Sequence, residues 1–149
     1  MKKKSGLSVI MPTYDQASFI RRAILSVFDQ TYEEWELIII NDGCTDDTRL
    51  YVDDFLSDSL IKYIENEKNK GLGFSVNQGL NVAKYNYIAY LPSDDYYLKN
   101  HLQSMMEKFE EYDTIILVYS CIMYQSLDTM GGFLQQKESY YIRKGYCLQ

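Results

Sequence analysis

The sequence of 149 residues is poor in proline, histidine and tryptophan, of which it has two, one and one. It has no low-complexity tract and no internal repeat, and its 46% hydrophobic and 24% charged residues are ordinary for a globular protein. These features argue against a disordered chain. A chain of this length buries about 68–70% of the surface that its unfolded form exposes. We therefore expect a single domain over residues 1–149.

Cysteine is also scarce and odd in number, at positions Cys44, Cys121 and Cys147. The spacing matches neither a disulfide framework nor a zinc site, so reduced thiols and a cytoplasmic location are expected. The single histidine, His101, has no cysteine or histidine at ligand spacing. We expect it on the surface of its helix.

Basic charge is lacking too, because the net charge is −6. This argues against a nucleic-acid partner, since such binding requires a basic surface. A small anionic ligand is still possible with help from a metal, a helix N-terminus or backbone N–H groups. The apolar run at residues 7–11 is interrupted by Ser8 and followed by Pro12, so it is too short for a signal peptide or a membrane span.

Short apolar runs alternate with amphipathic stretches along the chain. The runs predict strands at residues 7–11, 37–40, 61–64, 87–91 and 114–119. The amphipathic stretches predict helices near residues 19–28, 45–56, 74–83 and 98–109, the second with Thr45 as its N-cap. Strict alternation predicts an α/β fold with three layers, in which helices cover both faces of a mostly parallel sheet.

Ligands of such sheets bind beyond the carboxyl ends of the strands. Three segments lie at carboxyl ends here: residues 12–15, 41–43 and 93–95. We expect them to converge in one crevice.

The side chains of these segments suit the parts of a nucleoside diphosphate. Tyr14 can stack on a base, or it can pack at a loop edge. Asp42 can accept a hydrogen bond from a base N–H, or it can end its strand in an Asp-Gly turn. Asp94 and Asp95 can hold Mg²⁺ or Mn²⁺ between two phosphates, or they can cap the helix that starts near Leu98.

Six stretches together resemble family 2 glycosyltransferases of the GT-A fold. They are LSVIMPTY at residues 7–14, AILSVFDQTY at 23–32, ELIIINDGCTDDT at 36–48, NKGLG at 69–73, NQG at 77–79 and YIAYLPSDD at 87–95. Each stretch alone is a weak signal, but their order is specific, and the resemblance covers residues 7 to 120.

The resemblance implies a Rossmann-like domain that helps to transfer a sugar from a nucleotide donor to an acceptor, with inversion at the anomeric carbon and with Mg²⁺ or Mn²⁺ on the diphosphate. It implies a UDP-sugar as the donor and a glycan, lipid or cell-envelope polysaccharide as the acceptor. The implied donor-binding residues are Pro12, Thr13, Tyr14, Asp42, Gly71, Asn77 and Ser93, and the implied metal ligands are Asp94 and Asp95.

The sequence departs from the family pattern at two positions. Pro92 stands where the family often has an aspartate, which shortens the ligand set and favours Asp94 as the primary metal ligand. Val76 stands where the family often has an arginine, which removes a cation expected near the donor.

The general base of the family comes from the later half of the domain, so no catalytic residue is assigned. Asp128 and Glu138 belong to no motif, and we expect both at the surface. We interpret residues 1–120 as a donor-binding core and 121–149 as the start of the acceptor side of a truncated domain. The alternative is a module of the same fold that binds a nucleotide or protein without turnover. An aromatic edge strand within residues 138–146 predicts a homodimer, and segments outside this sequence would supply any peripheral contact with a membrane.

Overall fold

The computed structural model describes residues 6–111, 117–120 and 140–143. It forms two compact units, Met1–His101 and Leu102–Gln149. The first unit contains four parallel strands in the order β3-β2-β1-β4. The strands are β1 (Leu7–Thr13), β2 (Trp35–Asn41), β3 (Ile61–Glu65) and β4 (Tyr87–Tyr90), and the helices between them are α1 (Ile20–Phe28), α2 (Thr48–Asp53) and α3 (Leu72–Val82).

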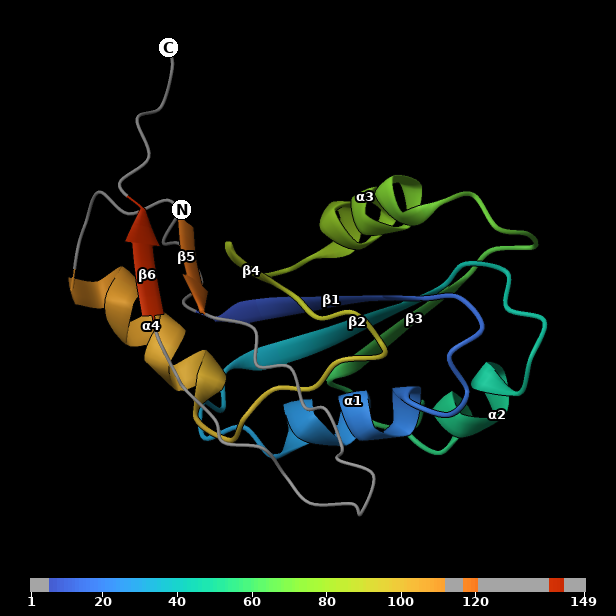
Figure 1. Cartoon of the computed structure of the whole chain (residues 1–149), viewed down its shortest axis with the longest axis horizontal. Helices are drawn as coiled ribbons and strands as arrows, with labels where there is room; N and C mark the ends of the chain where they lie inside the picture. The colour runs from blue at the N-terminus through green and yellow to red at the C-terminus, as the bar shows by residue number, and fades with distance from the viewer. Residues whose placement is uncertain (1–5, 112–116, 121–139, 144–149) are drawn as a thin grey trace, which may run out of the picture. The chain divides into compact units, whose positions relative to one another are not determined.

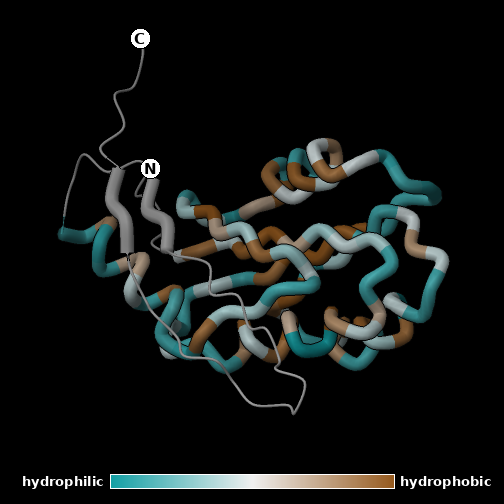
Figure 2. The backbone as a smooth tube through the Cα atoms, in the orientation of Figure 1, coloured by the Kyte–Doolittle hydropathy of each residue, from teal (hydrophilic) through white to brown (hydrophobic). Residues whose placement is uncertain are grey.

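Helices cover both faces of this sheet, with α1 and α2 on one face and α3 on the other (Figure 1). Every residue of β1 and β2 is buried, as expected for central strands of a parallel sheet. The apolar residues gather along these strands, while the connecting loops are largely hydrophilic (Figure 2). The predicted three-layer α/β fold is confirmed.

The sheet and α3 approach each other closely at Gly79. A Cβ atom at this position would lie 2.7 Å from Ile10 Cγ2 and 3.1 Å from Ile40 Cδ1. Only glycine lets the helix backbone come this close to the two central strands. This contact sets the position of α3, whose N-terminus lies at the carboxyl edge of the sheet.

Proline does not stop β1, contrary to the sequence prediction. The strand continues through Pro12 to Thr13, opposite Ile40 and Asn41 of β2. Successive residues of a strand direct their backbone hydrogen bonds to opposite neighbours. Ile10 faces β4, because its carbonyl oxygen accepts from the N–H of Leu91. Pro12 therefore faces the same side, beyond the end of the β1–β4 pairing, where no N–H is needed.

The second helix is shorter than predicted and its N-cap is Asp47, so the prediction for Thr45 was wrong. The Thr45 N–H is instead 2.7 Å from Asp15 Oδ1, because the loop after β2 pairs with the loop after β1. Phe55 and Leu56 lie in turns after the helix end. The helix predicted from Leu98 begins at His101 as α4 (His101–Glu111).

The described strands of the second unit are β5 (Leu117–Ser120) and β6 (Tyr140–Arg143), which pair antiparallel. The predicted fifth strand therefore exists in part, but its described residues belong to a separate antiparallel pair rather than to the parallel sheet. The predicted strand within residues 138–146 is confirmed over its described part. In the described ranges we find no helix with the length and apolar character needed to cross a membrane.

Candidate functional site at the carboxyl edge of the sheet

The three segments predicted to converge do meet at the carboxyl edge of the sheet. Asp42 N–H donates to Thr13 O at 2.9 Å, which joins the ends of β2 and β1. The Ser93 hydroxyl, 3% exposed, donates to Thr13 Oγ1 at 2.9 Å, which joins the loop after β4. Thr13 thus connects all three segments.

A pocket of about 240 Å³ opens at this edge. Its walls come from the end of β1, the end of β2 and the start of α3. The lining residues are Pro12, Thr13, Tyr14, Asp42, Asn69, Leu72 and Ser75. Tyr14 is 45% exposed, so its ring is accessible at the pocket for stacking.

Asp42 is the charged group of this pocket, and it is only 4% exposed. Its Oδ1 accepts hydrogen bonds from Asn66 Nδ2 at 2.9 Å and from Lys70 N–H at 3.0 Å. Its Oδ2 accepts one from Gly71 N–H at 2.8 Å. Asn66 is itself held by a reciprocal amide pair with Gln78 of α3.

Desolvation raises the pKa of Asp42, but the hydrogen bonds from Lys70, Asn66 and Gly71 outweigh it and the net pKa is lowered. The carboxylate is therefore ionised at neutral pH and acts only as an acceptor. The Asp-Gly turn of the alternative interpretation is also present. Gly43 has a φ of +74°, and a Cβ there would lie 2.4 Å from the Lys68 carbonyl carbon.

Two other predicted donor-binding residues belong to α3 and its N-cap. Gly71 is the N-cap of the helix and binds Asp42 through its N–H. Asn77 is exposed, and it is not among the residues that line the pocket. The structure thus places Gly71 at the site, whereas it does not bring Asn77 into it.

Asp94 and Asp95 are both exposed in the loop that follows β4. Arg22 of α1 holds this loop by donating to Asp94 O at 2.8 Å, while its guanidinium lies 4.7 Å from the centre of the Tyr96 ring. Burial raises the pKa of Tyr90, and the charges of Asp94 and Asp95 raise it further. Both carboxylates are accessible to a cation from solvent.

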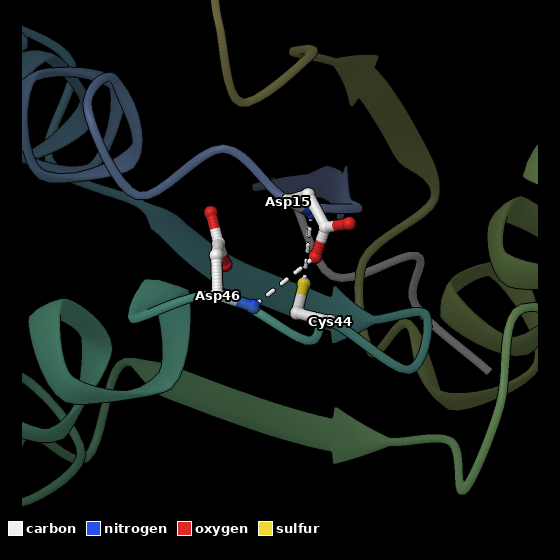
Figure 3. Close-up of side chains that lie close together, drawn as sticks. All are labelled: Asp15, Cys44 and Asp46. Carbon is white, nitrogen blue, oxygen red and sulfur yellow. Dashed lines mark hydrogen bonds between the residues drawn. The ribbon is translucent and has the colours of Figure 1, made fainter.

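A second group of possible metal ligands consists of Asp15, Cys44 and Asp46, with ligand atoms within 4.8 Å of one another (Figure 3). Asp15 Oδ1 accepts the N–H of Thr45, and the Asp46 oxygens accept those of Ala17 and Thr48. Burial raises the pKa of the Cys44 thiol. A protonated thiol is a poor ligand for hard cations, and this group instead fastens the loop after β1 to the loop after β2.

His101 is not on an open helix surface, contrary to the sequence prediction. Its ring stacks on Tyr97 with 4.1 Å between the ring centres. Burial lowers its pKa to about 4, so the imidazole is neutral at physiological pH.

The residues that sequence reasoning missed are Asn66, Asn69, Leu72 and Ser75. Asn69 and Leu72 belong to the NKGLG stretch, which indicated that this loop is part of the site but did not show which of its residues line the pocket. Ser75 carried no signal, because one serine in a helix is common and nothing in the sequence brings it to Asp42.

The architecture and the pocket define a Rossmann-like α/β domain with a polar ligand site at the carboxyl edge of its sheet. The family model described as "Glycosyl transferase family 2" matches residues 8–145. The chain belongs to this family, and the resemblance noted in the sequence is confirmed.

Relatives of known sequence and structure agree with this assignment. An Escherichia coli protein named UDP-Glc:alpha-D-GlcNAc-diphosphoundecaprenol beta-1,3-glucosyltransferase WfgD is 43% identical over 68% of the chain and 41% of its own length. An uncharacterized glycosyltransferase of Rickettsia bellii is 34% identical over 92% of the chain and 19% of its own length. The structure of S. aureus TarS 1–349 in complex with UDP-GlcNAc is 25% identical, with a TM-score of 0.69 over 87% of this chain and 37% of that chain. The chain thus spans about a fifth to two fifths of the length of these proteins.

Proposed function

We propose that the chain binds the nucleotide-sugar donor in a metal-assisted, inverting glycosyl transfer. The observation that carries this proposal is the pocket at the carboxyl edge, where an ionised Asp42 and the accessible Tyr14 ring lie together. The pocket lies at the carboxyl ends of the strands, which is where parallel α/β sheets bind their ligands. TarS in complex with UDP-GlcNAc supports a nucleotide sugar as the ligand class.

In this proposal each wall of the pocket has a separate task. The Tyr14 ring stacks on the base, and Asp42 accepts a hydrogen bond from a base N–H. Thr13 and Ser93, joined by their hydroxyl groups, hold the end of β1 and the loop after β4 together beside the pocket. Pro12 contributes an apolar wall.

Asp94 and Asp95 are suited to Mg²⁺ or Mn²⁺. These cations take one or two carboxylates from the protein and fill their other positions with water and phosphate oxygens. Both carboxylates are exposed, and Arg22 of α1 fixes the backbone of their loop by donating to Asp94 O. A bound cation supplies charge neutralisation on the diphosphate.

The acceptor belongs to the proposal as well. The names of WfgD and of the Bacillus subtilis protein "Putative teichuronic acid biosynthesis glycosyltransferase TuaG", 35% identical over 70% of the chain, support a glycan or lipid-linked acceptor in cell-envelope polysaccharide synthesis. The base that deprotonates the acceptor hydroxyl is assigned to no residue of this chain, and Asp128 and Glu138 lie outside the described residues. A cytoplasmic location, a homodimer and peripheral membrane association stay predictions.

Calorimetric titration of the chain with UDP, CDP, GDP and ADP, in Mn²⁺ and in EDTA, tests donor binding. Asp94→Asn should weaken UDP binding about tenfold in Mn²⁺ and leave binding in EDTA unchanged, because one charged ligand is lost. Glu33→Gln removes one charge at an exposed position in the loop before β2 and serves as the control. Unchanged affinity of Asp94→Asn under both conditions would sink the metal assignment.

Release of UDP from a UDP-sugar then separates the two candidate activities. Release that depends on added acceptor supports a transferase. Binding without release, with acceptors supplied, supports the module that binds without turnover.

A further inference from the structure

The segment that bears Asp94 and Asp95 is a short loop closed by its own side chains. The Tyr97 hydroxyl donates to Tyr90 O at 2.8 Å, which joins the far side of the loop to the end of β4. Within the loop, Asp95 N–H donates to Pro92 O at 3.1 Å. The backbone of both aspartates therefore lies in one turn between two fixed ends.

A polar stripe along α1 contacts this loop. Its members, Arg22, Ser26 and Gln30, recur at four-residue steps and so lie on one face, with Gln30 just after the helix end. Ser26 Oγ accepts from Tyr97 N–H at 3.1 Å, and Gln30 Nε2 donates to Leu98 O at 2.7 Å. Ser26 and Gln30 are buried, and they hold the part of the loop that follows the carboxylates.

Arg22, the first member of the stripe, contacts the loop at the carboxylates themselves. Its Nη2 donates to Asp94 O at 2.8 Å, and its Cζ lies 4.7 Å from the centre of the Tyr96 ring. The preceding residue is held from the other side, because the Ser93 hydroxyl donates to Thr13 Oγ1 at 2.9 Å. The backbone at Asp94 is thus fixed to α1 directly and to β1 through Ser93.

The charge and exposure of Arg22 limit what it can contribute here. The residue is exposed, and exposed charged groups add little to the stability of a fold. A positive charge beside a cation site repels the cation, so the charge of Arg22 cannot favour metal binding. Position can favour it, because Mg²⁺ and Mn²⁺ take few protein ligands and groups that orient those ligands change metal affinity.

We propose that Arg22 is a positioning residue, which fixes the Asp94 backbone to α1 and so holds the carboxylates of Asp94 and Asp95 for a divalent cation. This inference rests on the proposed binding of Mg²⁺ or Mn²⁺ with the donor. It gives α1 a task at the site, although none of the residues that line the described pocket comes from this helix.

The test compares Arg22→Met with Arg21→Met, which removes the same charge one position earlier on α1. Arg21 is exposed and pairs with Asp54 at 2.7 Å rather than with the loop. UDP affinity is measured for the whole chain by calorimetry, in EDTA and over a series of Mn²⁺ concentrations, together with the melting temperature.

Arg22→Met should need about fivefold more Mn²⁺ than wild type for half of the gain in UDP affinity, because its carboxylates are held less firmly. Its UDP affinity in EDTA should be unchanged, and its melting temperature should stay within about 2 °C of wild type. Arg21→Met should stay within about twofold of wild type in its Mn²⁺ requirement.

The sign of the effect separates position from charge. Loss of a positive charge strengthens cation binding if the carboxylates stay in place. An unchanged or lower Mn²⁺ requirement of Arg22→Met therefore overturns the inference and leaves the metal assignment standing.

Three further outcomes also overturn the inference. A fall in the UDP affinity of Arg22→Met in EDTA shows that Arg22 contacts the nucleotide or supports the fold. Equal increases in the Mn²⁺ requirement of both variants show a general effect of charge on α1. Wild-type protein whose UDP affinity does not depend on Mn²⁺ refutes the metal assignment of the proposed function, and the inference fails with it.

Discussion

Two buried carboxylates, Glu36 and Asp42, lie at opposite ends of β2, 2% and 4% exposed. Glu36, at the amino end, accepts from Ser8 Oγ at 2.6 Å and Lys84 N–H at 2.7 Å, and its Oε2 lies 3.0 Å from Lys62 Nζ. Desolvation raises the pKa of Glu36, but these partners outweigh it and lower the net pKa.

Asp42 receives its hydrogen bonds from one neutral side chain and two backbone N–H groups, and it faces a pocket. The difference follows from the geometry of parallel sheets. Loops that leave the carboxyl edge diverge around a crevice, whereas the amino end here is closed by the chain that connects α3 to β4. One carboxylate therefore stabilises the fold, and the other also remains available to a ligand.

The largest effect is expected for Glu36→Ala. The change leaves Ser8 Oγ and Lys84 N–H without an acceptor and opens a cavity, which should lower the free energy of unfolding by about 3 kcal/mol. Lys62 is 40% exposed and can turn to water, so its charge adds little to the cost. Urea denaturation measures the loss, with exposed Glu34→Ala as the control. A loss below about 0.5 kcal/mol would remove the structural role of Glu36.

Asp42→Asn should affect binding more than folding. The amide loses the charge that a base N–H would meet, so UDP affinity should fall about thirtyfold, or about 2 kcal/mol. The free energy of unfolding should fall by about 1 kcal/mol, because the amide oxygen still accepts from some of the loop N–H groups.

Glu36→Gln is the matched change at the other end of the strand. It should leave UDP affinity within about twofold of wild type. If the two amide variants lose UDP affinity equally, the division between a structural and a ligand-facing carboxylate fails.

The contrast between these carboxylates also explains what could be predicted from the sequence. β1 and β2 were predictable because short, mostly apolar runs are typical of central parallel strands. The convergence of the strand ends at Asp42 followed from topology. Glu36 was unremarkable in the sequence, because its partners Ser8 and Lys84 are 28 and 48 residues away.

Side-chain hydrogen bonds between loops limited the other predictions. Thr45 has the chemistry of an N-cap, but its hydroxyl donates to the Asp15 carboxylate at 3.3 Å, 30 residues away in the sequence. Ser75 lines the same pocket as Asp42, and the close packing of α3 on Ile10 that Gly79 allows sets the position of this helix. Such pairings depend on tertiary contacts that local patterns do not contain.

The pH dependence of stability offers a finer comparison. A carboxylate with a lowered pKa contributes stability that is fully present above its unfolded pKa, about 4.3 for Glu and 3.9 for Asp. That contribution is lost as the pH falls through the folded pKa, so wild-type stability should be level above about pH 5 and decline below it. Urea denaturation of Glu36→Gln from pH 7 to pH 3 should show a shallower decline. A decline as steep as that of wild type would mean that other carboxylates dominate acid unfolding.

The smallest effect is expected for Lys62→Met. Lys62 Nζ also donates to Val82 O at 2.8 Å, but its side chain is 40% exposed, and pairs of this kind contribute about 0.5 kcal/mol. In this variant Glu36 keeps its hydrogen bonds from Ser8 and Lys84, which still compensate its charge. Asp42 is in a similar state, because within the described residues it has hydrogen-bond donors but no ion pair. Urea denaturation should give nearly the same difference in the free energy of unfolding between this variant and wild type at low and at high salt. A loss of 2 kcal/mol or more would show that the two carboxylates differ in how their charge is held, because Glu36 would then need a cation where Asp42 needs only N–H donors.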